Sequence, residues 1–392
     1  MDRQIETFRA EVMRHLLKAL SRQSEPFISV LGRSQNCDPA FLMDVLREME
    51  ARGFVRVSSG GPGRECAITA HAGTRTPVPR KLCEPAPSQD SEDPRRGILA
   101  SGYFGDLTSA VSKSLPEPGL VYSQWWFSEP TYAKLVDLLL QLMRKNAHVA
   151  FAGSSTLGAV FSHCAASPVT IIDVDAVLLK RIACCVDKPA QFICRDISNP
   201  LDTCLKGKFD IVFADPPWSS SDLKTFFVRS SEMLAAEGTL VISFPPVFTR
   251  PSARTERKNL LRMAELLGLS FTTELKGFTE YSVPMFEYRA YKEHGIELSQ
   301  PWRKGDVLIF KKRNKGTKCA DIPVEACYIW DQYDYDMTRL FLKRNGSIEG
   351  GPACICVGSA AIGQRVLWAS RVDRWLTYSI VGSCMAFVKS WI

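Results

Sequence analysis

The predicted fold of this chain depends most on the stretch Phe209-Asp-Ile-Val-Phe-Ala-Asp-Pro-Pro-Trp218. Its apolar first part predicts a short buried strand. The strand is expected to end at Asp215, because Pro216 and Pro217 have no N–H to donate to a neighbouring strand. A carboxylate, two rigid peptide units and an indole are therefore presented together at the carboxyl end of a strand. Open α/β sheets bind their ligands at that edge.

These residues suit an amino nitrogen on a planar ring. Asp215 and the carbonyl groups around Pro216 can accept hydrogen bonds from an NH2 group, and the face of Trp218 can stack on the ring. Pro216 and Pro217 hold the acceptors still, so that little entropy is lost when a substrate docks. The alternative is a plain strand end with a Pro-Pro turn and a half-buried tryptophan.

Strands and helices alternate on both sides of this stretch, which predicts a mostly parallel sheet. We expect a doubly wound, Rossmann-like α/β fold. Its predicted parallel strands cover residues 148–152, 169–172, 191–194, 209–214 and 238–243, and residues 271–275 and 307–311 would complete an antiparallel end.

The residues that follow the first three strands fit a nucleoside cofactor. Gly153 lets the backbone approach a ligand closely, and Ser154 and Ser155 continue the same turn. Asp173 is placed to take both ribose hydroxyls, and Asp196 is placed for the adenine edge. We therefore expect these five residues to bind the cofactor, and Asp215 to Trp218 to act on the acceptor.

This order of features resembles the class I S-adenosylmethionine-dependent methyltransferases, in which Asp215-Pro-Pro-Trp218 looks like the motif that serves amino groups, especially N6 of adenine. The stretches Tyr122-Ser-Gln-Trp-Trp-Phe-Ser-Glu129 and Phe286-Glu-Tyr-Arg-Ala-Tyr291 are similar to the small family first called N6-adenine methyltransferase-like. Some members of that family modify protein lysines. The resemblance implies S-adenosylmethionine as cofactor and an amine in nucleic acid, protein or a small molecule as acceptor.

Residues 95–312 also resemble the branched-chain polyamine synthases, which carry an N-terminal winged helix before a Rossmann-like domain. That resemblance implies aminopropyl transfer from decarboxylated S-adenosylmethionine to a polyamine. The sequence departs from this family where the glycine-rich turn has Ser154-Ser155-Thr156 in place of acids, and where Trp218 replaces an acid. A polycation needs carboxylates, so we favour methyl transfer. Aminopropyl transfer is the alternative, and a non-catalytic winged-helix adaptor is the second alternative.

Residues 1–70 predict a winged-helix-like domain. A helix over residues 38–52 would have Asp38 as its N-cap and Pro39 in its first turn, and Gly53 would end it. A strand, a turn and a second strand follow, and resemble a wing. Two roles stay open for this domain: contact with nucleic acid through the helix and the wing, or docking and dimerisation with protein.

Three further regions complete the predicted organisation. Residues 71–96 are a proline-rich linker that lacks the apolar surface to fold. Residues 97–315 are the catalytic domain, and residues 316–392 are an extension without an assigned role. Within the catalytic domain a basic stretch either tracks a phosphate backbone or forms a solvated helix face. Its members are Arg250, Arg254, Arg257, Lys258 and Arg262.

Composition sets wider limits on the 392 residues. A formal net charge of +7 permits an acidic partner without requiring one. We expect no membrane span, because there is no run of 18 apolar residues, and no apolar signal core at the N-terminus. The 13 cysteines are scattered without a Cys-x-x-Cys pair, which predicts reduced thiols, no metal site and a cytoplasmic protein. Oligomeric state stays open.

Overall fold

The computed structural model describes two long parts of the chain and several short ones. The N-terminal part comprises residues 2–20, 24–58 and 67–70, and the catalytic part comprises residues 124–186, 188–284 and 300–313. The remaining described residues are 115, 118, 122, 288, 291, 296, 298, 322, 324, 330–335, 338–343 and 385–387.

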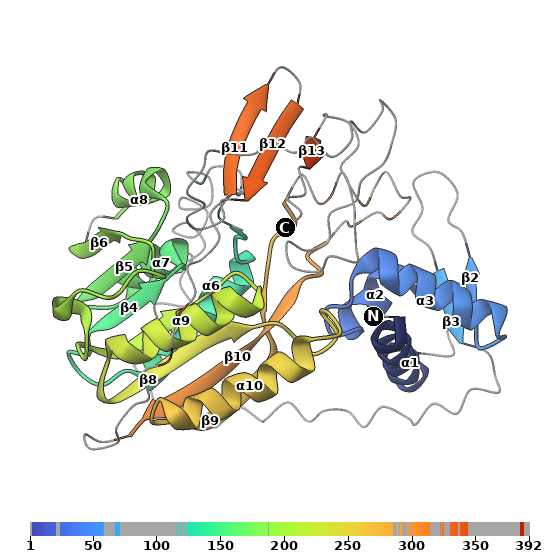
Figure 1. The fold of residues 1–392 in the computed structure, drawn as a ribbon, viewed down its shortest axis with the longest axis horizontal. Coiled ribbons are helices and arrows are strands. Elements are labelled where there is room, and N and C mark those ends of the chain that lie inside the picture. Colours follow the sequence, from blue (N-terminus) through green and yellow to red (C-terminus); the bar gives the residue numbers. More distant parts are fainter. Residues whose placement is uncertain are drawn as a thin grey trace, which may run out of the picture.

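A seven-stranded sheet forms the centre of the catalytic part, with the strand order β6-β5-β4-β7-β8-β10-β9 (Figure 1). The first five strands in that order run parallel, and β10 pairs antiparallel with both β8 and β9. The predicted Rossmann-like fold is thereby confirmed. The strands are β4 (Val149–Ala152), β5 (Val169–Asp173), β6 (Ala190–Cys194), β7 (Phe209–Ala214), β8 (Leu234–Phe244), β9 (Leu269–Glu280) and β10 (Lys304–Lys312).

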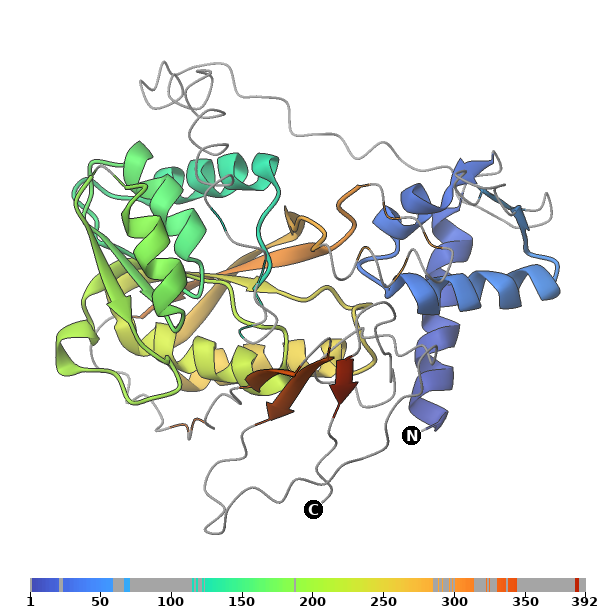
Figure 2. The same ribbon diagram turned by 90° about the horizontal axis from the view of Figure 1, so that it is seen from above.

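Helices cover both faces of this sheet, because successive residues of a buried strand point to opposite sides. In β7, Ile211 and Phe213 join the core beneath α6 (Glu129–Leu142) and α7 (Ser155–Cys164). Val212 and Ala214 join the core beneath α9 (Ser220–Met233) and α10 (Ala253–Leu266). Helix α8 (Ala176–Ala183) packs beside α7. Figure 2 shows the sheet between these two helical layers.

The N-terminal part contains three helices and a small antiparallel sheet with the order β1-β3-β2. The helix predicted over residues 38–52 is α3, and its N-cap Asp38 accepts a hydrogen bond from the Phe41 N–H at 2.9 Å. Gly53 follows the helix with φ of +75°. The elements are α1 (Asp2–Ala19), β1 (Glu25–Pro26), α2 (Phe27–Arg33), α3 (Pro39–Ala51), β2 (Val55–Ser58) and β3 (Ala67–Ala70). The name winged helix, and either role for this domain, stay predictions.

Three strands lie in the predicted C-terminal extension: β11 (Trp330–Tyr335), β12 (Thr338–Lys343) and β13 (Met385–Phe387). They form a separate sheet, in which β12 pairs antiparallel with β11 and parallel with β13. The predicted linker over residues 71–96 lies outside the described residues, and the domain boundaries stay predictions.

The described residues contain neither a membrane-spanning helix nor a metal-binding cluster. None of their helices is long and apolar enough to span a lipid bilayer. In the same residues, no group of three or more His, Cys, Asp or Glu side chains stands close enough to hold a metal ion.

Candidate active site

Backbone hydrogen bonds bring three predicted site residues, Gly153, Asp173 and Asp215, together at the carboxyl edge of the sheet. The N–H of Arg195 donates to the Asp173 carbonyl at 2.7 Å, and the N–H of Gly153 donates to the Ile172 carbonyl at 3.0 Å. The N–H of Asp215 donates to the Ala152 carbonyl at 3.2 Å. The ends of β6, β5, β4 and β7 therefore follow one another along a single edge.

Gly153 occupies a position that a residue with a side chain would strain. Its φ is +64°, a conformation that L side chains rarely adopt. A Cβ at this position would lie 2.8 Å from Cε1 of Phe226 and 3.2 Å from the carbonyl oxygen of Asp215. The turn after β4 therefore passes directly beside the end of β7.

The next two residues and Asp173 form a polar group beside that turn. Ser155 donates its hydroxyl to Asp173 Oδ2 at 2.6 Å, and the N–H of Asp175 donates to Asp173 Oδ1 at 3.1 Å. Burial raises the pKa of Asp173 above its ordinary value. The Oγ of Ser154 is buried and has no hydrogen-bond partner among the described residues. An unpaired buried hydroxyl beside an oriented carboxylate fits a ligand that carries hydroxyl or amino groups.

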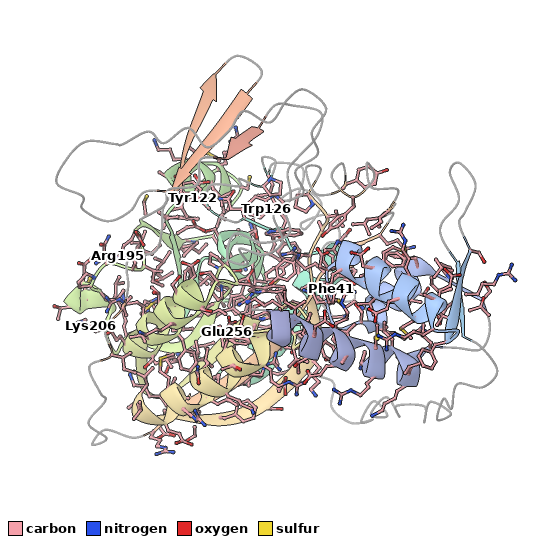
Figure 3. The ribbon with its side chains drawn as sticks, turned by 45° about the vertical axis from the view of Figure 1, so that its right-hand side comes forward. Phe41, Tyr122, Trp126, Arg195, Lys206 and Glu256 are labelled. Atoms are coloured by element: carbon pink, nitrogen blue, oxygen red, sulfur yellow. The ribbon has the colours of Figure 1, made fainter. Side chains whose placement is uncertain are left out.

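The carboxylate of Asp196 makes a hydrogen bond within the protein that the sequence did not predict. Its Oδ1 accepts the N–H of Ser198 at 2.8 Å, which closes a local turn after β6. Gln124, in the segment before α6, donates to Asp175 Oδ2 at 2.8 Å just after the end of β5. The pKa of Tyr122 is raised by its partial burial and by the nearby charge of Asp175. Figure 3 labels Tyr122 and Trp126 of this segment and Arg195 at the end of β6.

Asp215 meets a pair of hydroxyl groups that the sequence did not indicate. Tyr281 Oη donates to Asp215 Oδ1 at 2.7 Å and lies 2.7 Å from Ser243 Oγ. Burial raises the pKa of Asp215 to about 7, against the opposing effect of the Tyr281 hydrogen bond. The pKa of Tyr281 is itself raised by burial and by the Asp215 charge, so Tyr281 stays protonated and keeps donating.

Aromatic rings surround this carboxylate. Tyr281 makes T-shaped contacts with Trp218, at 5.5 Å between ring centroids, and with Trp125, at 6.5 Å; Phe127 lies against Tyr281 at 5.0 Å. The guanidinium of Arg303 lies 3.8 Å from the centroid of the Trp125 ring. Phe127 is buried and packs in the core, whereas Trp125 and Trp218 keep part of their surface accessible. Trp125 and Phe127, in the segment before α6, therefore contribute to packing and also border the Asp215 region.

Sequence analysis missed Tyr281 and Ser243 for a physical reason. Tyr281 follows Asp215 by 66 residues, and no local pattern links the two positions. The strand predicted for residues 271–275 extends to Glu280 as β9, because β10 pairs along nearly its whole length. This extension delivers Tyr281 to the site. Ser128 occupies the N-cap position of α6, but its hydroxyl bonds to Thr131 Oγ1 at 3.0 Å and makes no capping bond to the backbone.

Most of the predicted basic stretch forms salt bridges with carboxylates of the same chain. Arg250 pairs with Glu256, and Arg254 pairs with Glu11 at 3.3 Å. Arg257 bridges Glu274 and Asp306. Three of the five basic side chains therefore have internal partners.

The match to known families covers the region that contains this site. Residues 120–292 match the family model described as probable N6-adenine methyltransferase. A match of 27% identity over 158 residues links the chain to an uncharacterized protein of Methanocaldococcus jannaschii. It covers 38% of this chain and 40% of that protein, so the chain spans two fifths of the length of this curated relative.

Among solved structures, the branched-chain polyamine synthase of Thermus thermophilus is similar over most of both chains. The enzyme, in complex with N4-aminopropylspermidine and 5'-methylthioadenosine, has a TM-score of 0.61 at 17% identity and covers 81% of this chain and 90% of its own. Its C9 mutein has a TM-score of 0.62 with the same identity and coverage. Similarity at this identity concerns the fold alone. Residues 120–292 are thus similar to the probable N6-adenine methyltransferases, as the sequence predicted, and the chain is folded like the branched-chain polyamine synthase.

Proposed function

We propose that this protein transfers a methyl group from S-adenosylmethionine to an amino nitrogen that is held at Asp215-Pro-Pro-Trp218. The observation that supports this most is the position of Asp215, a carboxylate at the end of β7 whose Oδ1 is held by Tyr281 at 2.7 Å. The family match over residues 120–292 supports the same class of reaction.

The residues at the ends of β4 and β5 are suited to hold the cofactor. Gly153 leaves its turn without a side chain, and Asp173 is oriented by Ser155. The buried hydroxyl of Ser154 has no hydrogen-bond partner in the part of the chain that the structure describes. Asp196 is proposed for the adenine edge, through the oxygen that its local turn leaves unused. When bound, S-adenosylmethionine would supply an electrophilic methyl group: its sulfur–methyl bond breaks as the nitrogen–methyl bond forms, S-adenosylhomocysteine leaves, and the acceptor nitrogen loses one proton.

Asp215 would orient the acceptor. As a carboxylate it accepts an N–H of the amine, which leaves the nitrogen lone pair directed elsewhere. The carbonyl of Pro216 accepts the second N–H, Pro217 stiffens the turn, and Trp218 stacks on the acceptor. Because these groups are held before substrate arrives, positioning supplies much of the rate effect.

A labelled-methyl screen tests this proposal. The purified protein is offered DNA, RNA, protein and small amines, and we expect one class to take up label. Asp215→Ala should abolish transfer while cofactor affinity, measured by calorimetry, stays nearly unchanged. Asp210→Ala is the matched control, because Asp210 lies on the same strand and accepts the His148 N–H at 2.8 Å at the opposite end. An active Asp215→Ala protein would refute the assignment.

Aminopropyl transfer is the second candidate, and the fold similarity to the Thermus thermophilus polyamine synthase over 81% of this chain favours it. The Ser154-Ser155 turn and Trp218 supply no carboxylates for a polycation, which is why methyl transfer is preferred. Decarboxylated S-adenosylmethionine and spermidine, followed by mass analysis for a longer amine, decide between the two reactions.

A further inference from the structure

One residue of the N-terminal part reaches the strand that supports Trp218. Asn36 lies in the turn between α2 and α3, has a φ of +66° and is 4% exposed. Its Nδ2 donates to Thr249 Oγ1 at 3.1 Å, and its Oδ1 accepts the N–H of Lys304 at 2.9 Å. Both hydrogen bonds therefore cross from the N-terminal part to the catalytic part.

The backbone that Asn36 holds borders the acceptor side of the site. Lys304 begins β10, and a Cβ on the next residue, Gly305, would lie 3.1 Å from Trp218 Cζ2 and 3.1 Å from Ser243 Oγ. Ser243 meets Tyr281, which in turn donates to Asp215. A shift of the start of β10 would therefore reach both the indole and the hydroxyl pair.

An apolar core continues across the same boundary. Phe8 of α1 packs with Phe248 at 6.2 Å between ring centroids, and His15 lies 5.1 Å from the same ring. The buried side chains of Tyr291 and Trp302 belong to this core as well. Figure 1 shows α1, α2 and α3 beside the ends of α10 and β10.

The beginning of α3 is engaged in this contact. Asp38 Oδ1 caps the helix, and Asp38 Oδ2 accepts the Tyr291 hydroxyl at 2.6 Å. Phe41, labelled in Figure 3, packs against the shared core. Recognition helices of helix-turn-helix proteins read bases with their N-terminal residues, and here that end faces protein. The arrangement favours protein docking over groove reading for this helix.

We infer that the N-terminal domain is a fixed part of the acceptor site, and that Asn36 is a positioning residue that sets the start of β10 and through it Trp218. The expected effect on turnover rests on the proposed function, whereas the contact between Asn36 and the start of β10 does not depend on it. Loss of the Asn36 side chain should loosen the acceptor side and leave the cofactor side, at the ends of β4 and β5, as it was.

Hydrogen exchange of the full-length protein tests the contact without any turnover. Asn36→Gly keeps the left-handed backbone while it removes both hydrogen bonds. We expect the amide of Lys304 to exchange about tenfold faster, as the loss of a buried hydrogen bond predicts, with no change at residues 153–155. Gln35→Gly is the matched control, because Gln35 is the exposed neighbour and also has a positive φ, of +54°.

Steady-state kinetics supply the second measurement. Asn36→Gly should lower kcat/KM for the acceptor about tenfold, and the Kd for S-adenosylmethionine should stay within about twofold, as expected for a contact on the acceptor side alone. Thr249→Val, which keeps the Lys304 contact, should give a smaller loss and serves if Asn36→Gly does not fold. Unchanged exchange at Lys304, or an equal loss of cofactor affinity, overturns the inference. If the unsubstituted protein transfers no methyl group, the proposed function is wrong. The hydrogen-exchange result at Lys304 still tests the inference in that case.

Discussion

Removing the Tyr281 hydroxyl should move the pH dependence of the enzyme. Tyr281→Phe deletes the donor that lies 2.7 Å from Asp215 Oδ1 and keeps the ring that packs on Trp218 and Phe127. This hydrogen bond favours the ionised carboxylate, whereas burial opposes it and raises the pKa of Asp215 to about 7. Without the donor, only burial and the weaker Ser243 interaction act on the group, so its pKa should rise further.

The size of the change follows from the strength of a hydrogen bond to a charged group. Such a bond contributes about 1.5–3 kcal/mol, and one pH unit corresponds to about 1.4 kcal/mol. The apparent pKa should therefore rise by about one to two pH units, with the lower end expected because Ser243 can still donate. At pH 7 the ionised fraction would fall from about one half to about one tenth or less, so kcat/KM should fall at least about fivefold.

The assay is the pH profile of kcat/KM for the acceptor between about pH 6 and pH 10, in which activity rises as the carboxylate ionises. The Tyr281→Phe profile should lie at higher pH and approach the parent value at its alkaline end. Tyr132→Phe is the matched control, because it removes a buried hydroxyl that bonds to Thr156 Oγ1 at 3.0 Å. A profile of Tyr281→Phe that coincides with the parent's, or a loss that is equal at every pH, would show that this hydroxyl does not act through the charge of Asp215.

Three other substitutions test the same edge of the sheet. Asp215→Asn should raise the free energy of unfolding by about 2–4 kcal/mol at pH 8 and leave it unchanged near pH 4. The reason is that the raised pKa of Asp215 makes its ionisation destabilise the folded state, and this loss grows as the pH rises toward 7. Urea unfolding at both pH values measures the effect, and equal shifts at both would contradict it. Gly153→Ala should cost about 1–3 kcal/mol from its left-handed backbone and weaken S-adenosylmethionine binding in calorimetry, since its Cβ would meet Phe226 at 2.8 Å. Asp173→Asn should weaken the same binding about tenfold through loss of a charged acceptor; an unchanged Kd would remove Asp173 from the cofactor site.

Local features of this protein followed from the sequence, because each depends on a few neighbouring residues. The Pro216-Pro217 pair ends β7 where the missing N–H groups require it. Gly153 has the positive φ expected of a turn that allows close approach. Asp38 caps α3 through its own side chain. The parallel arrangement of these strands in one sheet followed as well, since alternating short apolar runs and amphipathic helices have few ways to bury both faces of a sheet.

The long-range contacts were decided only by the tertiary structure. Tyr281 meets Asp215 across 66 residues, and Asn36 meets Lys304 across 268 residues. Strand β10 lies between β8 and β9. Its apolar sequence is typical of any buried strand and does not by itself specify these neighbours. A tyrosine, an asparagine and an apolar strand satisfy the same local rules in many places. Which partner each one takes depends on how the whole sheet and the N-terminal helices pack, and that packing sets both the charge of the site and the support behind its tryptophan.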